Sequence, residues 1–202
     1  MNGTKAFSLL LCAGLAGSLL AGGDTWNQAA GGAWGDAANW KNKTVPGGKT
    51  DADVAYLPAF PAPVTITHTG TTDLNAFSFA GDGIYTVSGG AFNLYGAGNG
   101  DQKRGVWIPA GKGTLTLACD VTTKGNVPLF VNAGATLKTD GTVQLSGNVN
   151  SWTVKKGAGT WAIGERSYST RTTSASPRAS STSCPAPRSR ACRLTYGPRG
   201  WR

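Results

Sequence analysis

A short pattern of residues recurs in the second half of the chain. Residues 111–117 read Gly-Lys-Gly-Thr-Leu-Thr-Leu, and residues 157–163 read Gly-Ala-Gly-Thr-Trp-Ala-Ile. In both, glycines precede a short run in which every second residue is apolar, which is the pattern of a half-buried β-strand. A unit that recurs in this way indicates coils stacked on one another, because one such coil is too small to bury its own apolar face.

Short candidate strands follow one another through the middle of the chain, and most are separated by glycine, often with Asn or Asp. Such corners need positive φ angles, which glycine adopts without steric cost. Helix-forming residues are scarce, since Glu165 is the only glutamate and Met1 the only methionine. We therefore expect an all-β chain. The candidate strands are residues 64–68, 76–79, 85–87, 92–94, 106–108, 115–121, 129–131, 136–138, 143–145, 152–154 and 161–163.

Short strands at this spacing fit either a parallel β-solenoid or a β-sandwich. We favour the solenoid because several corners are equivalent, with a glycine directly before an apolar-x-apolar strand. The two-residue Asn-Gly and Asp-Gly signals of β-hairpins are also sparse and irregularly placed. The sandwich remains the alternative. The equivalent corners lie at residues 90–94, 113–117, 141–145 and 159–163.

Residues 1–23 have the features of a cleaved secretory signal peptide. Lys5 precedes a short apolar run, and small residues at 21–23 come before Asp24. A membrane anchor would need about 20 strongly apolar residues, and this run is shorter and diluted by glycine. A lipoprotein anchored at Cys12 is less favoured, because no small residues precede that cysteine. We expect cleavage near Gly23, no transmembrane span in the mature chain, and a secreted or cell-surface location.

Export to an oxidising compartment permits disulfides, so the three remaining cysteines matter. Cys119 shares one face of its candidate strand with Leu115 and Leu117, and we expect it in the core. Cys184 and Cys192 lie in the C-terminal tail and are a candidate disulfide. Three cysteines do not make a disulfide framework.

Of the net charge of +9, the C-terminal tail, residues 165–202, contributes +7, from eight Arg and one Glu. From residue 24 to 164 the chain has nine Lys, one Arg and nine Asp, which leaves +1. Arg, Ser and Pro make up 20 of the last 38 residues. Two interpretations remain: a natural disordered tail, or, as we favour, a reading frame that slipped near residue 165. Because the basic residues are confined to this tail, we expect no nucleic-acid partner.

Residues 24–63 are irregular in pattern and rich in tryptophan, before the candidate solenoid at 64–164. Trp26, Trp34 and Trp40 have two interpretations. We favour a cap, because a solenoid must cover the apolar core and unpaired backbone of its first coil. The alternative is a ligand-binding site in which these rings stack on a glycan, as in a carbohydrate-binding module.

Two sequence patterns in the chain resemble those of a known family. The N-terminal pattern W…G.W…NW…P…D.A is met by Trp26, Trp34, Asn39-Trp40, Pro46 and residues 53–55. Residues 155–164, Lys-Lys-Gly-Ala-Gly-Thr-Trp-Ala-Ile-Gly, are similar to the repeat K-x-G-x-G-T-L-x-L-x-G. With the leader, residues 24–168 resemble the N-terminal part of a bacterial autotransporter-associated β-strand repeat protein.

That resemblance implies a right-handed parallel β-helix, a pectin-lyase-like fold, on the surface of a Gram-negative-type bacterium. It implies a structural or adhesive passenger whose partner is an extracellular glycan or a host or neighbouring surface. The family's repeat would continue with Asn-x-Tyr-x-Gly-x-Thr after residue 164, but this chain continues with Glu165 and an Arg/Ser-rich segment. The chain therefore corresponds to a truncated or frameshifted fragment.

Many parallel β-helices cleave polysaccharides, so a polysaccharide lyase or hydrolase is the third candidate. Such chemistry needs paired carboxylates in one cleft, or a carboxylate cluster that holds calcium. Asp51 and Asp53 are the closest pair, in a region where Asp more often caps turn amides. His68, the only histidine, shares a strand face with Ile66 and belongs to no nucleophile pattern. We therefore predict no catalytic residues, no metal site and no cofactor. The other aspartates lie singly, mostly beside turns, at Asp73, Asp82, Asp101, Asp120 and Asp140.

Overall fold

A computed structural model describes residues 22–97, 100–145, 152–164 and 167–169 of the chain. This part is almost entirely β, as expected, with two short 3-10 helices, η1 (Ala37–Asn39) and η2 (Asp101–Lys103). Most of the expected leader, the Cys184–Cys192 pair and most of the tail lie outside the described residues. The strands are β1 (Asp24–Thr25), β2 (Gly32–Ala33), β3 (Val54–Pro58), β4 (Val64–Thr67), β5 (Thr71–Leu74), β6 (Ala76–Ala80), β7 (Ile84–Leu94), β8 (Gly105–Ile108), β9 (Thr114–Thr123), β10 (Val127–Val131), β11 (Thr136–Thr139), β12 (Val143–Leu145), β13 (Thr153–Lys156), β14 (Thr160–Ile163) and β15 (Ser167–Ser169).

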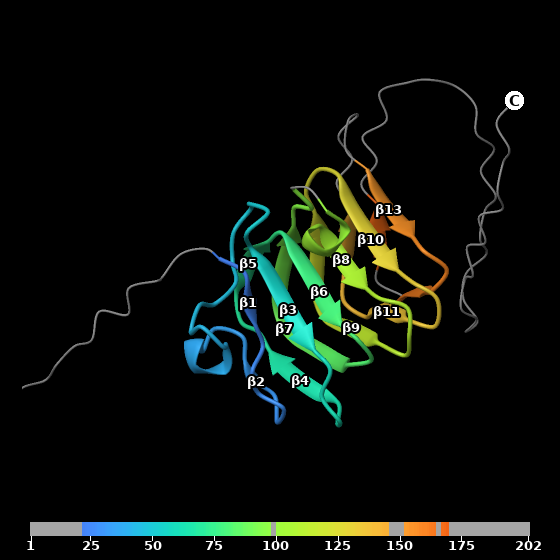
Figure 1. Cartoon of the computed structure of the whole chain (residues 1–202). Helices are drawn as coiled ribbons and strands as arrows, with labels where there is room; N and C mark the ends of the chain where they lie inside the picture. Colours follow the sequence, from blue (N-terminus) through green and yellow to red (C-terminus); the bar gives the residue numbers. More distant parts are fainter. Residues whose placement is uncertain (1–21, 98–99, 146–151, 165–166, 170–202) are drawn as a thin grey trace, which may run out of the picture.

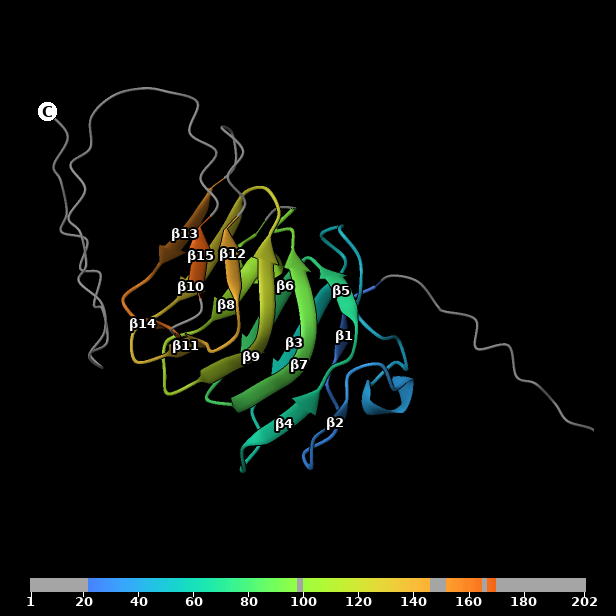
Figure 2. The same cartoon turned by 180° about the vertical axis from the view of Figure 1, so that it is seen from behind.

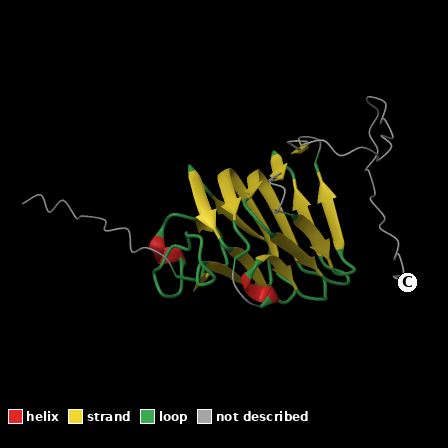
Figure 3. Ribbon diagram, turned by 90° about the horizontal axis from the view of Figure 1, so that it is seen from above, coloured by secondary structure: helices red, strands yellow, loops and turns green. Residues whose placement is uncertain are grey.

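The strands form two parallel sheets, between which the chain alternates. The six-stranded sheet has the order β1-β3-β6-β8-β10-β13 and faces the viewer in Figure 1. The nine-stranded sheet runs β14-β11-β9-β7-β4-β2, with β5, β12 and β15 beside it, and faces the viewer in Figure 2. Figure 3 shows the two layers from above. All pairings between these described strands are parallel, unlike the antiparallel sheets of the β-sandwich considered above.

The core lies between the two sheets and consists of inward side chains aligned from strand to strand. In the six-stranded sheet Ala55 pairs with Phe77, Phe77 with Val106, and Val106 with Leu129. All four are buried. Removing a large apolar side chain from water contributes about 1.5–3 kcal/mol, so the aligned rows are the main source of stability. In the nine-stranded sheet the corresponding row is Val64, Tyr85, Leu115, Leu137 and Trp161.

Two expectations about individual strands need correction. Residues 24–63 were expected to be irregular, but they supply β3, because Ala55 and Leu57 alternate inward and complete the six-stranded sheet. Residues 85–87 and 92–94 were expected to be separate strands, but β7 runs through both. A bulge between Ser88 and Ala91 bends this strand, and Gly89 and Gly90 there have positive φ angles.

The corners between strands approach each other closely, which explains why glycine recurs there. Gly134 has a φ of +81°, and a Cβ atom at this position would lie 2.5 Å from the carbonyl oxygen of Gly111 on the neighbouring corner. Gly70 has a similar φ of +74° but open space around it. Both positions therefore require a positive φ angle, but only at Gly134 would a Cβ atom contact a neighbouring corner.

We predict that Gly134→Ala is more destabilising than Gly70→Ala. Each substitution should cost about 1–2 kcal/mol because an L-residue is strained at this φ. Gly134→Ala should cost a further 1–3 kcal/mol, approximately, because its methyl group pushes the two corners apart. The free energies of unfolding in urea measure this difference. Equal costs for the two variants would contradict the close packing of these corners.

Candidate functional site

The three tryptophans of the N-terminal region gather into one buried cluster. Trp26 follows β1, Trp34 follows β2 and Trp40 follows η1, and each is only 1% exposed. Trp40 lies edge-on to both others, with ring centroids 5.1 Å from Trp26 and 4.9 Å from Trp34. This is the favoured geometry for aromatic pairs, because the positive ring edge meets the negative ring face.

The indole N–H groups of the cluster are all bonded within the same region. Trp26 donates to the carbonyl of Gln28 at 2.7 Å, Trp40 to that of Trp34 at 2.8 Å, and Trp34 to that of Pro46 at 3.3 Å. Neither the ring faces nor the polar edges are open to a sugar. We therefore do not retain Trp26, Trp34 and Trp40 as a glycan-stacking site.

Trp34 joins the tryptophan cluster to the core. Its ring centroid lies 5.8 Å from that of Phe77 on β6 and 4.9 Å from that of Phe92 on β7. The cluster thus covers the N-terminal end of the aligned apolar rows. This placement supports the interpretation of residues 24–63 as a cap.

We predict that Trp34→Ala destabilises the protein by about 3–5 kcal/mol, because it empties the centre of this cluster. Trp152→Ala is the matched control, since Trp152 is 41% exposed and should change stability by less than about 0.5 kcal/mol. Thermal or urea unfolding distinguishes the two. A Trp34→Ala variant as stable as the control would show that the cluster does not support the core.

Five of the nine aspartates bond to backbone amides, and Asp73 instead accepts from the side chain of Asn93 and pairs with Lys49 at 3.4 Å. Asp24 accepts the backbone N–H groups of Asn42 and Thr44, and Asp53 accepts the N–H and hydroxyl of Thr50. Asp51, the other member of the closest sequence pair, is exposed. Three further carboxylates each accept one backbone amide. These pairs are Asp36 with Ala38, Asp82 with Lys112 and Asp120 with Thr142.

No metal site is formed by the described part of the chain, in which no three His, Cys, Asp or Glu side chains come together. Cys119 is buried in the core as expected, with 4% of its surface exposed. Burial, together with the nearby charge of Asp120, raises the pKa of its thiol to about 12. Cys119 is therefore a protonated core residue at neutral pH rather than a nucleophile.

His68 lies inward among aromatic rings, on the same face as Ile66. Its ring stacks on Phe92 at 4.4 Å between centroids and meets Trp34 at 6.0 Å, and its Nε2 atom is buried without a hydrogen-bond partner. Burial lowers the pKa of His68 below its ordinary value of 6.5, and the backbone of Ala91 opposes this shift. The cluster therefore favours the neutral imidazole.

We predict that His68 makes stability depend on pH. As the pH falls below 6.5, the unfolded chain binds a proton before the folded chain does, so stability present above that pH is progressively lost. The loss should continue until the pH falls below the folded-state pKa. The urea midpoint of the wild type should therefore drop more between pH 7.5 and 5.5 than that of His68→Phe, which keeps a ring but cannot titrate. Identical drops in both proteins would refute this role of His68.

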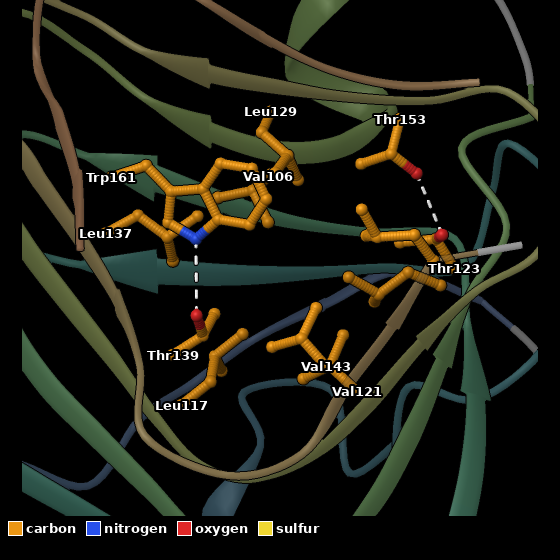
Figure 4. A pocket seen from close by; sticks show the side chains of 12 residues that line it. Val106, Leu117, Val121, Thr123, Leu129, Leu137, Thr139, Val143, Thr153 and Trp161 are labelled. Atoms are coloured by element: carbon orange, nitrogen blue, oxygen red, sulfur yellow. Dashed lines mark hydrogen bonds between the residues drawn. The ribbon is translucent and has the colours of Figure 1, made fainter. Parts of the chain in front are cut away.

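The interior of the two-sheet stack leaves no room for a ligand at the cavity shown in Figure 4. The cavity has a volume of about 10 Å³, roughly one water molecule, and lies between Leu129, Leu137 and Trp161. Ligand pockets are on the order of 300–1,000 Å³. Two threonine contacts border it: Thr123 with Thr153 at 2.8 Å, and Thr139 with the indole of Trp161 at 3.3 Å.

The outer faces of the two sheets differ in chemistry. One outward row of the nine-stranded sheet consists of Thr65, Thr86, Thr116, Lys138 and Ala162. The corresponding row of the six-stranded sheet, which we call the outer aromatic row, consists of Tyr56, Ser78, Trp107, Phe130 and Lys156.

Sequence analysis placed residues 106–108 on a candidate strand but did not identify the outer aromatic row as a site. The alternation around Trp107 is the signal that could have found it. Val106 and Ile108 are both buried at 0% exposure, so the residue between them must point outward.

In comparisons with known proteins, no family model, no curated protein and no solved structure matches the chain. Neither of the short helices in the described residues has the length and apolar character needed to cross a bilayer.

Proposed function

We propose that the chain is an exported structural or adhesive scaffold built as a right-handed parallel β-helix. The observation that carries this proposal is the regular alternation of the chain between two parallel sheets, with each strand in register with its predecessor. Connections between parallel strands of one sheet are right-handed in about 98% of cases, which favours this hand. The resemblance to autotransporter-associated β-strand repeat proteins supports the same architecture.

A non-catalytic role fits the placement of the charged side chains. Asp24, Asp36, Asp53, Asp82 and Asp120 all accept backbone amides. They hold corners and neighbouring segments together, which is the work of a scaffold. A lyase or hydrolase would instead need two carboxylates free to face one sugar.

The N-terminal residues are the basis for the proposed export, because Lys5 and the apolar run that follows it would direct the chain out of the cytoplasm. We predict that the full chain, expressed in a Gram-negative host, is recovered outside the cytoplasm with an N-terminus near Asp24. A Leu10→Arg variant should stay inside and keep its leader, because a charge interrupts the apolar run. Fractionation and intact-protein mass spectrometry measure both.

Unprocessed wild-type chain in the cytoplasm would overturn the proposed export. The scaffold part of the proposal is checked on the same purified protein by far-UV circular dichroism. A spectrum dominated by β-structure is expected, and a spectrum without it would count against a folded scaffold.

A further inference from the structure

The outer aromatic row presents partly exposed rings in a fixed arrangement. Tyr56 and Trp107 are partly exposed, whereas Phe130 is 8% exposed. The rings of Trp107 and Phe130 lie 5.6 Å apart at 55°, and the ammonium group of Lys156 lies 5.2 Å from the centre of the Phe130 ring. Trp107 and Lys156 therefore each rest on Phe130, so these two side chains would lose little freedom when a ligand binds.

Polar atoms at the edges of the exposed rings are free to bond a ligand. In the described part of the chain, neither the hydroxyl of Tyr56 nor the indole N–H of Trp107 has a hydrogen-bond partner, whereas the N–H groups of the buried Trp26, Trp34 and Trp40 all do. An aromatic face beside a free donor suits a ligand with apolar C–H faces and hydroxyl groups. Sugar rings have both.

The shape of the exposed surface favours a linear ligand over a protein partner. The outward row on one side is largely covered, since Val54, Ala76, Gly105 and Pro128 are buried and only Val154 at its end is exposed, at 38%. On the other side Pro58 is partly exposed and Ala80 is exposed. The accessible surface on these strands is therefore a narrow strip that runs across them, whereas a protein interface needs about 800 Å² on each partner. Tyr56 and Trp107 are two strands apart, which corresponds to about 9.5 Å along the sheet. An extended chain of sugars laid across the strands would meet both rings.

The charge on this sheet indicates an acidic ligand. Within the strands of the six-stranded sheet the charged residues are Asp24, Lys155 and Lys156. Asp24 is buried and its carboxylate is bonded to backbone amides, so the exposed charge in the outer aromatic row is that of Lys156. An anionic group would be attracted to this end of the row and would meet no opposing carboxylate from these strands.

We propose that the outer aromatic row binds a linear acidic polysaccharide, which stacks sugar rings on Tyr56 and Trp107 and places an acidic group against Lys156. This site gives the proposed adhesive scaffold a partner class, and in that respect it rests on the proposed function. Binding by the purified full chain does not depend on export, so the two proposals can fail separately.

The test is affinity electrophoresis of the full chain in native gels that contain alginate, a linear uronate polymer, with hydroxyethylcellulose as the neutral comparison. Alginate should retard the wild type. Trp107→Ala and Tyr56→Ala should each weaken binding about tenfold, because each removes a stacking surface. Trp152→Ala, which removes an exposed tryptophan outside the row, should bind as the wild type does. Lys156→Gln should weaken binding to alginate about threefold at low salt and leave binding to the neutral polymer unchanged.

Several outcomes would overturn the proposal. These are a wild type that alginate does not retard, equal losses in Trp107→Ala and Trp152→Ala, and equal binding of the neutral polymer with no effect of Lys156→Gln. Trp107→Phe keeps a ring and should retain most of the affinity, which separates lost stacking from misfolding. Light scattering measures the oligomeric state of the wild type and of Trp107→Ala. A wild-type dimer that this substitution dissociates would assign the row to self-association instead.

Discussion

The structure depends on parallel strands held in register by backbone hydrogen bonds. Register places Phe77 on Ala55 and Leu115 on Tyr85, so each inward side chain is covered by one from a neighbouring strand. No strand buries its apolar face alone, and stability is then a sum of contacts between neighbours. Beside the first described strands, β1 and β2, a compact cluster built around Trp34 packs against the core residues Phe77 and Phe92.

The strands could be predicted from the sequence because successive side chains of a β-strand point to opposite faces, so apolar residues recur at every second position. The same rule placed Cys119 in the core and put His68 on the face of Ile66. It failed at Gly89 and Gly90, where two consecutive glycines resemble a corner between strands. In the structure they form a bulge inside β7, because the strand on either side continues to pair with β9. Local sequence does not distinguish a bend from a break when the partner strand is unknown.

The sites were harder to predict because they combine residues from separate segments, and no periodicity in the sequence shows which segments meet. The tryptophans of the N-terminal region are buried by one another and by carbonyls of Gln28, Trp34 and Pro46, and nothing in an irregular segment shows which way its rings face. The outward direction of Trp107 follows from its strand. Its alignment with Tyr56 and Phe130 does not, because alignment depends on the length of each connecting loop.

The last described strand of the six-stranded sheet is polar at its two inward positions, where Thr153 pairs with Val127 and Lys155 with Leu129. The ammonium group of Lys155 donates to the carbonyl of Gly157, just beyond β13. Another molecule that extended the sheet at β13 would have to strip water from this cation, at a cost of several kcal/mol. Within the described residues, Lys155 thus disfavours the pairing of a second molecule along β13.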